Sequence, residues 1–111
     1  MEYFYNTKQA AQFNPEKMNK VNLYESEKLF CDVYCLLPGQ AQKDHDHVEN
    51  DKIYHALSGE CTVRIGDETQ LLRPGELAVA PAGVIHGVVN QSEEPATLLV
   101  VMAPHPNYIE K

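Results

Sequence analysis

The sequence predicts an all-β fold of the sandwich or barrel type. Glycine and proline interrupt the chain at short intervals, and the segments between them are short and apolar or alternating. That rhythm is typical of β-sandwiches and barrels. The length of 111 residues fits one domain with a single core. With 43% hydrophobic and 23% charged residues, the composition is that of an ordinary globular protein.

Seven segments are the predicted strands, each bounded by glycine, proline or polar residues: 29–37, 53–57, 61–65, 69–72, 77–80, 84–89 and 96–102. The clearest alternation is in 61–65, where Cys61, Val63 and Ile65 share one face. Segment 96–102 is almost entirely apolar, which predicts burial on both faces. A helix is expected only near the N-terminus, where 16–20 has weak helical propensity.

The charge of the chain limits its partners. A formal net charge of -7 argues against a nucleic-acid partner and against anionic membrane surfaces. The N-terminal residues lack the basic start and apolar run of a secretory signal, and no apolar stretch is long enough to cross a membrane. We therefore expect a cytoplasmic protein. Its three cysteines form no obvious disulfide framework, which agrees with that compartment.

Three histidines are the candidate metal ligands. His45 and His47 are two residues apart, so in a strand both imidazoles project from one face. His86 belongs to another predicted strand. Imidazole suits iron, nickel, manganese, copper or zinc, and histidines that converge inside a barrel leave metal positions open for water or substrate. The alternative is a degenerate site, in which the histidines line the pocket or bind a ligand directly.

The spacing of glycine, proline and histidine resembles the two sequence motifs of the cupin superfamily. The first motif is matched by Gly39, His45, His47 and Gly59, and the second by Gly75, Pro81, Gly83, His86 and Asn90. The resemblance covers roughly residues 30–102. It implies a double-stranded β-helix, also called a jelly-roll barrel, in a single domain over 1–111 with a divalent transition metal held by the three histidines.

Lys52 departs from the cupin pattern, because it stands where the first motif has a metal-binding glutamate. An ammonium has no lone pair for a metal. Glu49 and Asp51 are close in sequence but fall in the turn before the strand. The histidine set therefore resembles that of three-histidine cupins such as cysteine dioxygenase. Without the carboxylate the pocket keeps more positive charge, which favours a small anionic ligand.

Lys52 and Tyr54 are the candidate catalytic residues, since strand alternation places both on one face. The alternatives are a solvated lysine whose stem packs on the barrel and a tyrosine that only packs. The same alternation places His55 on the opposite face, while His105, between two prolines, is expected in an exposed loop. Cys31 and Cys35 are expected as small buried residues too far apart to form a disulfide.

These observations favour a metal-dependent enzyme, whose reaction could be that of an oxygenase, a lyase or an isomerase. A non-catalytic module that binds or senses a small ligand, with or without metal, is the alternative. A homodimer is also predicted, because a small barrel with an apolar last strand needs cover for its open strands. The N-terminal arm 1–20, which contains Tyr3, Phe4 and Tyr5, is expected to cross to the partner.

Overall fold

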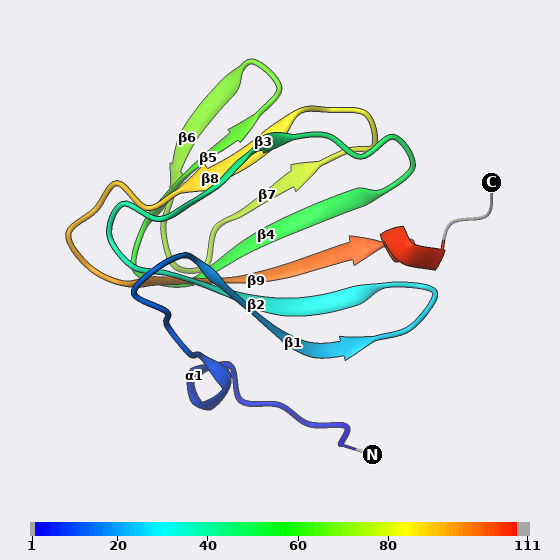
Figure 1. Cartoon of the computed structure of the whole chain (residues 1–111). Helices are drawn as coiled ribbons and strands as arrows, with labels where there is room; N and C mark the ends of the chain where they lie inside the picture. Colours follow the sequence, from blue (N-terminus) through cyan, green and yellow to red (C-terminus); the bar gives the residue numbers. More distant parts are fainter. Residues whose placement is uncertain (1, 109–111) are drawn as a thin grey trace.

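The computed structural model describes residues 2–108 and confirms the all-β prediction. Two sheets face each other, and the short helix α1 with the segment that precedes it lies outside them (Figure 1). The elements are α1 (Thr7–Ala10), β1 (Asn19–Glu25), β2 (Phe30–Leu36), β3 (Ala41–His45), β4 (Asp51–Ser58), β5 (Cys61–Ile65), β6 (Glu68–Leu72), β7 (Leu77–Ala80), β8 (His86–Val89), β9 (Ala96–Ala103) and the 3₁₀ turn η1 (Pro106–Tyr108). The ends of the predicted domain, Met1 and residues 109–111, lie outside the described residues.

Strands that are distant in sequence lie next to each other in both sheets. The larger sheet has the order β1-β2-β9-β4-β7 and the smaller one β3-β8-β5-β6, and the paired strands within residues 2–108 are antiparallel. Because β3 pairs with β8, the histidine pair of the first motif is brought to the histidine of the second.

The core lies between the sheets and follows the period of two along each strand. In β4 the residues at 52, 54 and 56 are buried while Asp51 and Ile53 are exposed. Strand β9 contributes Leu98, Val100 and Met102 to the interior, and Leu99 and Val101 are half-buried on its other face. The predicted two-sided burial of this strand is thus largely met.

Two strands and the helix differ from the sequence prediction. Strand β1 was not predicted, and β3 was expected only through the strand placement of His45 and His47. Neither strand shows an apolar stripe, since their residues are exposed or half-buried and none is fully buried. A helix does occur within the first twenty residues, but not at 16–20, since Asn19 and Lys20 begin β1. The only α-helix of the described chain is α1, where the Asn6 side chain accepts hydrogen bonds from the backbone N–H groups of Lys8 and Gln9.

Two motif residues shape the barrel ends. Gly59, at φ 66, leaves no room for a side chain, because an added Cβ would collide with the Pro95 carbonyl oxygen. The buried amide of Asn90 donates to the carbonyl oxygens of Leu36 at 3.0 Å and Glu94 at 2.8 Å, which ties the loop before β9 to the end of β2. These motif positions therefore serve the fold.

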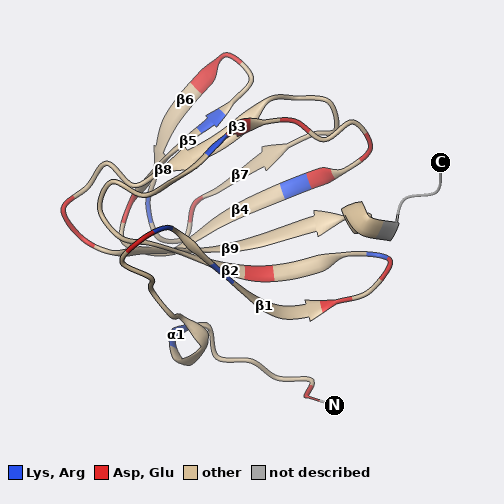
Figure 2. Cartoon of the chain, viewed as in Figure 1, with Lys and Arg blue, Asp and Glu red and all other residues tan. Residues whose placement is uncertain are grey.

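Acidic residues outnumber basic ones and lie largely in the turns and at strand ends (Figure 2). Lys52 is an exception among the basic residues, because its side chain is buried. Within residues 2–108, no helix has the length and apolar character required to span a membrane.

Candidate metal centre and cavity

His45 and His86 face each other across the β3–β8 pair. They are register partners, and their ring centroids are 4.3 Å apart. A register shift between Gln42 and His45 marks an irregularity in β3. Such a bulge changes which side chains face inward. The direction of the His45 side chain therefore does not follow from regular strand alternation.

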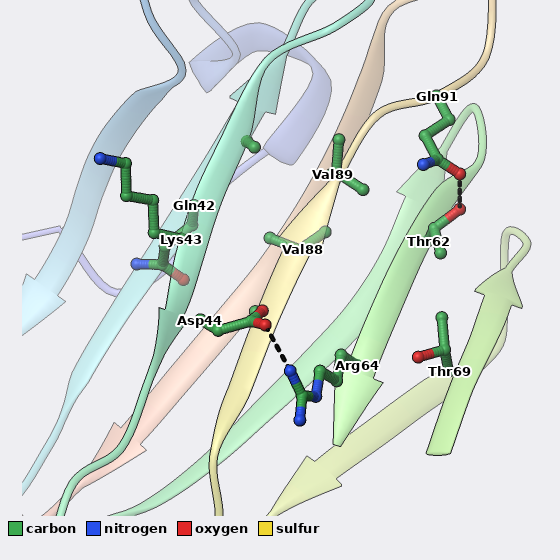
Figure 3. Close-up of a pocket in the computed structure, with 11 residues that line it drawn as sticks. Gln42, Lys43, Asp44, Thr62, Arg64, Thr69, Val88, Val89 and Gln91 are labelled. Atoms are coloured by element: carbon green, nitrogen blue, oxygen red, sulfur yellow. Dashed lines mark hydrogen bonds and ion pairs between the residues drawn. The ribbon is translucent and has the colours of Figure 1, made fainter. Parts of the chain in front are cut away.

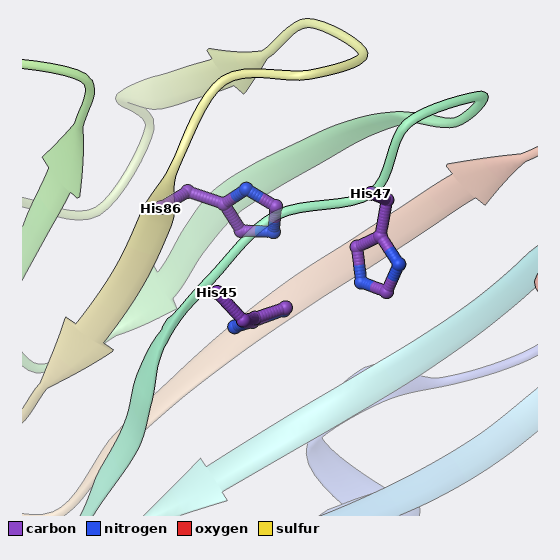
Figure 4. A group of neighbouring side chains, drawn as sticks. All are labelled: His45, His47 and His86. Carbon is purple, nitrogen blue, oxygen red and sulfur yellow. The ribbon is translucent and has the colours of Figure 1, made fainter.

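His47 lies beyond the end of β3, in the loop that leads to β4, so its predicted place in a strand is wrong. It still joins the cluster: its ring centroid is 4.9 Å from that of His45 and 5.6 Å from that of His86. Figure 4 shows the His86 side chain reaching from β8 toward the rings of His45 and His47. One ligand nitrogen from each residue lies within 4.8 Å of the other two.

Backbone hydrogen bonds orient two of the rings. The Nδ1 of His45 lies 2.7 Å from the Lys43 carbonyl oxygen, and the Nδ1 of His86 lies 2.9 Å from that of Val84. When Nδ1–H donates to a carbonyl, the lone pair of the neutral ring is on Nε2. The Nε2 of His86 is buried and has no hydrogen-bond partner. An orphaned acceptor of this kind is costly unless something binds it.

Burial keeps the three imidazoles neutral. It lowers the pKa of His86 to about 4, and it is the main cause that lowers the pKa of His45 and of His47. Nearby positive charge, including that of Lys52, acts in the same direction. A neutral imidazole is the form that binds a metal.

The residues present fit a divalent metal with three nitrogen ligands. An imidazole nitrogen binds zinc at about 2.1 Å, so small ring rotations would draw the three nitrogens around one ion. The cluster among the described residues contains histidines only. Glu49 and Asp51 are exposed, and Asp51 accepts a hydrogen bond from the backbone of Ala82 at 2.9 Å. Neither replaces the missing carboxylate.

Lys52 points into the barrel, where it is only 1% exposed. Its Nζ donates to Oε1 of Gln42 at 3.0 Å, and the Tyr54 hydroxyl donates to the same oxygen at 3.0 Å. Gln42 in turn donates through Nε2 to the Tyr34 hydroxyl at 3.4 Å. The Lys52 Nζ also lies 5.4 Å and 5.0 Å from the ring centroids of Tyr34 and Tyr54. Lys52 and Tyr54 thus share one polar network.

Burial determines the charge of this network. It lowers the pKa of Lys52 to about 7, and the nearby Lys20 acts in the same direction. It raises the pKa of Tyr34 to about 12 and also raises that of Tyr54. At neutral pH the tyrosines keep their protons, while a large fraction of Lys52 is an uncharged amine.

A cavity of about 410 Å³ connects this network with His45 and His47. One part of its wall is apolar or aromatic and consists of Phe30, Tyr34, Met102 and Pro106. The polar part consists of Lys20, Gln42, Lys43, His45, His47 and Lys52. Three lysines and no carboxylate line it, although the whole chain is acidic. More basic than acidic side chains therefore line this cavity.

Sequence reasoning missed Gln42 and Tyr34. Tyr34 could have been found, because it lies in a predicted strand and is buried. Gln42 could not, since strict alternation from His45 would turn Lys43 inward instead, and the register shift reverses that.

The expectations for the other histidines and for two cysteines are met in some cases and wrong in others. His55 lies on the half-buried outer face of β4, as expected. His105 is buried and not in an exposed loop: its Nε2 lies 2.9 Å from a Glu25 carboxylate oxygen, and its ring packs edge-on against Phe30. His105 thus packs at the start of β2 and the turn before it, which the proline-rich sequence did not reveal. Cys31 and Cys35 are free, although Cys31 is only half-buried.

A second hollow of about 400 Å³ lies on the smaller sheet, away from the cluster, and no histidine lines it. Figure 3 shows Asp44 and Arg64, which form a 2.7 Å ion pair there, and the hydrogen bond between Thr62 and Gln91. Both ion-pair side chains are about 40% exposed, with 42% for Arg64 and 43% for Asp44. Because the pair is solvated and already satisfied, this hollow offers less chemistry than the histidine cavity.

Comparison with known proteins identifies related chains. Residues 32–102 match the family described as "Cupin domain". The TT1209 protein from Thermus thermophilus has 54% sequence identity to this chain, and its crystal structure superposes with a TM-score of 0.91 over 93% of this chain and 98% of that one. A double-stranded beta-helix protein from Klebsiella pneumoniae is 23% identical, with a TM-score of 0.88 over 100% of both chains, which shows the jelly-roll fold.

Two further relatives match a smaller share of the chain. An uncharacterized protein from Streptomyces coelicolor is 31% identical over 72 residues, which cover 65% of this chain and 68% of that protein. A cupin-superfamily sugar phosphate isomerase from Silicibacter pomeroyi is 29% identical, with a TM-score of 0.66 over 71% of this chain and 52% of that one.

Proposed function

The chain belongs to the cupin domain family, and from that premise we propose that it is a metal-dependent enzyme acting on a small anionic molecule. His45, His47 and His86 would hold the metal. One observation carries the proposal: the buried Nε2 of His86 has no hydrogen-bond partner and belongs to a cluster of three converging nitrogens. Ligation by a metal is the simplest way to satisfy it.

The substrate class follows from charge. Three neutral imidazoles would leave a divalent ion with its full +2 charge, and Lys20, Lys43 and Lys52 line the adjoining cavity. A carboxylate, enolate or phosphate group suits that field. The Silicibacter pomeroyi relative, named as a sugar phosphate isomerase, agrees with an anionic substrate.

Each group has a separate task in this proposal. A bound metal supplies Lewis-acid or redox chemistry, as in oxygenases, lyases and isomerases. Lys52 and Tyr54 are the residues that would hold or move a proton, because their Nζ and hydroxyl share the Oε1 of Gln42 at the cavity. The phenolic O–H of Tyr54 stays protonated at neutral pH and can donate to a substrate oxygen.

The second candidate is a non-catalytic module that binds or senses an anion. The position of Lys52 supports it, since an amine stands where the first cupin motif has a metal-binding glutamate. The two candidates differ in turnover, which oxygen consumption and product analysis with a panel of small carboxylates and diketones would detect.

Metal content tests the proposal. Untagged protein purified without chelator should contain about one iron, nickel, copper, manganese or zinc ion per chain. The His86→Ala variant should lose it. The matched control is His55→Ala, which removes a histidine from the outer face of β4 and should leave metal content unchanged. No metal after loading with each of these ions would contradict the enzyme proposal.

A further inference from the structure

The amine of Lys52 lies in surroundings that suit its uncharged form. An ammonium presents three N–H donors, but within residues 2–108 the Nζ of Lys52 has one hydrogen-bond acceptor, the Oε1 of Gln42. No ion pair with Lys52 occurs among residues 2–108. The faces of Tyr34 and Tyr54 attract a cation, but that attraction does not outweigh burial, and the pKa of Lys52 is lowered to about 7.

The same amine is part of the cavity wall. Lys52 lines the cavity of about 410 Å³ together with Lys20 and Lys43. Unlike Lys52, Lys20 and Lys43 are exposed to solvent. A buried nucleophilic amine with two cations beside it matches a molecule that carries both a carbonyl group and a carboxylate.

We propose that Lys52 captures a small 2-oxo acid or aldehyde acid by forming an imine with its carbonyl carbon, while the carboxylate faces Lys20 and Lys43. The proposal goes beyond the proposed function, because imine formation requires no metal. In this inference Lys52 bonds covalently to the substrate, whereas in the proposed function it only holds or moves a proton.

The step balances without an oxidant or reductant. The lone pair of Nζ attacks the carbonyl carbon, the C=O π electrons move to oxygen, and one proton passes from nitrogen to that oxygen to give a carbinolamine. The hydroxyl group then leaves as water as the C=N bond forms and nitrogen loses its second proton. The proton that nitrogen loses supplies the second hydrogen of the departing water.

Reductive trapping tests the proposal. Chelator-treated, metal-free protein is incubated with glyoxylate and sodium cyanoborohydride at pH 7, and peptide mass mapping locates the added carboxymethyl groups. Lys52 should be labelled at least about tenfold faster than any exposed lysine, because an exposed lysine with a pKa near 10.4 is almost entirely protonated. The Lys52→Arg variant should lose this label, and the control Lys28→Arg, which changes an exposed lysine outside the cavity, should keep it.

Other outcomes would overturn the inference. Unlabelled Lys52 in folded protein whose surface lysines are labelled would overturn it, and this measurement needs no variant. Equal labelling by acetaldehyde, a neutral aldehyde, would remove the carboxylate preference. Because the protein is metal-free throughout, failure here leaves the metal proposal standing, and absence of a metal leaves this inference standing.

Discussion

At position 52 one side chain determines the charge of the cavity. A carboxylate there would lie on the inner face of β4, directed at the space that His45 and His47 also line. The lysine instead adds an amine, and its positive form repels both a metal cation and a protonated imidazole. Lys52 accordingly appears among the causes that lower the pKa of all three histidines.

Replacing this lysine with glutamate should strengthen metal binding. Lys52→Glu adds a potential fourth ligand and removes a positive charge, and we expect affinity for Zn²⁺ to rise by about tenfold, or about 1.4 kcal/mol. Isothermal titration calorimetry measures the change. Lys52→Gln is the matched control, because it removes the amine without adding a carboxylate and should give a smaller gain. Equal affinity in the glutamate variant and wild type would show that residue 52 does not reach the metal.

The buried amine also predicts how stability depends on pH. The pKa of Lys52 is about 7 in the folded protein and near 10.4 when unfolded, so between these values the unfolded chain binds more protons. Its contribution to the free energy of unfolding therefore rises with pH from about 7 to 10.4 and is constant below about 6. Lys20 on β1 and Asp32 on β2 face the same group, as do the histidines, which titrate below this range.

Lys52→Met should remove that rise. We expect the variant to be more stable than wild type by about 1–3 kcal/mol at pH 7, with the difference shrinking toward pH 10. Urea unfolding at several pH values provides the measurement. Because burial raises the pKa of Cys35 and of Cys61, the unfolded chain loses these thiol protons in this range while the folded protein retains them, so the difference between variant and wild type is the quantity to follow. A pH-independent difference would mean that Lys52 keeps an ordinary pKa.

Among the strands, those with one face buried in the core were the ones that the sequence predicted. Strand β5 was predicted with its correct bounds, because alternate residues such as Cys61 and Val63 are buried against the other sheet. Strand β1 is an edge strand with no buried residue, and β3 carries polar side chains toward both solvent and cavity. Apolar periodicity is informative only where one face meets the core, so it revealed neither strand, and the strand placement of His45 came from the spacing of the histidines.

The site was predictable for a different reason. His45, His47 and His86 were found by their chemistry and by the motif spacing, which does not depend on local periodicity. The hydrogen-bond partner of Lys52 could not be predicted, because Gln42 reaches the interior through a register shift. Pairing between distant strands leaves no local signal in one sequence.

The turn between β4 and β5 gives a prediction at the same scale. Gly59→Ala places a methyl group against the Pro95 carbonyl and Ala96, at a positive φ of 66°. Gly75→Ala is the matched control, because Gly75 also has a positive φ, 91°, but an added Cβ meets nothing there. We expect a cost of about 1–2 kcal/mol for the control from backbone strain and at least about 3 kcal/mol for Gly59→Ala. Equal costs in denaturant unfolding would exclude the close contact as a constraint.

For the whole molecule, the two sheets present different outer faces. The smaller sheet exposes polar side chains, including the ion pair of Asp44 and Arg64. The larger sheet exposes Leu77 at 56%, Val79 at 48% and Ile53 at 38%, which lie on neighbouring strands β7 and β4. The N-terminal segment exposes Tyr3 and, at 92%, Phe4. Adjoining apolar side chains of this kind favour an interface on the larger sheet.

We therefore expect a two-fold homodimer through the outer face of the larger sheet, with the N-terminal arm of each copy covering the other. Helix α1 borders this sheet, since Thr7 and Phe13 line a hollow with Leu57, so the preceding segment starts beside the apolar strands. Figure 1 shows that segment extending past α1 and away from the barrel. An extended arm with exposed aromatic rings buries little surface on its own chain, whereas a partner copy related by a two-fold axis offers each arm the same apolar strip.

Light scattering during gel filtration measures the mass of the assembly and so tests the predicted homodimer. Wild type should have twice the chain mass of 12.5 kDa, and Val79→Asp and Phe4→Asp should each shift the equilibrium toward the monomer, because a carboxylate in an apolar interface carries a desolvation cost. Leu71→Asp makes the same kind of change on β6 of the smaller sheet and should leave the dimer intact. A monomeric wild type would disprove the dimer, and dissociation by Leu71→Asp alone would move the interface to the other sheet. Retention of the dimer in Phe4→Asp with loss in Val79→Asp would keep the sheet interface but remove the crossing arm.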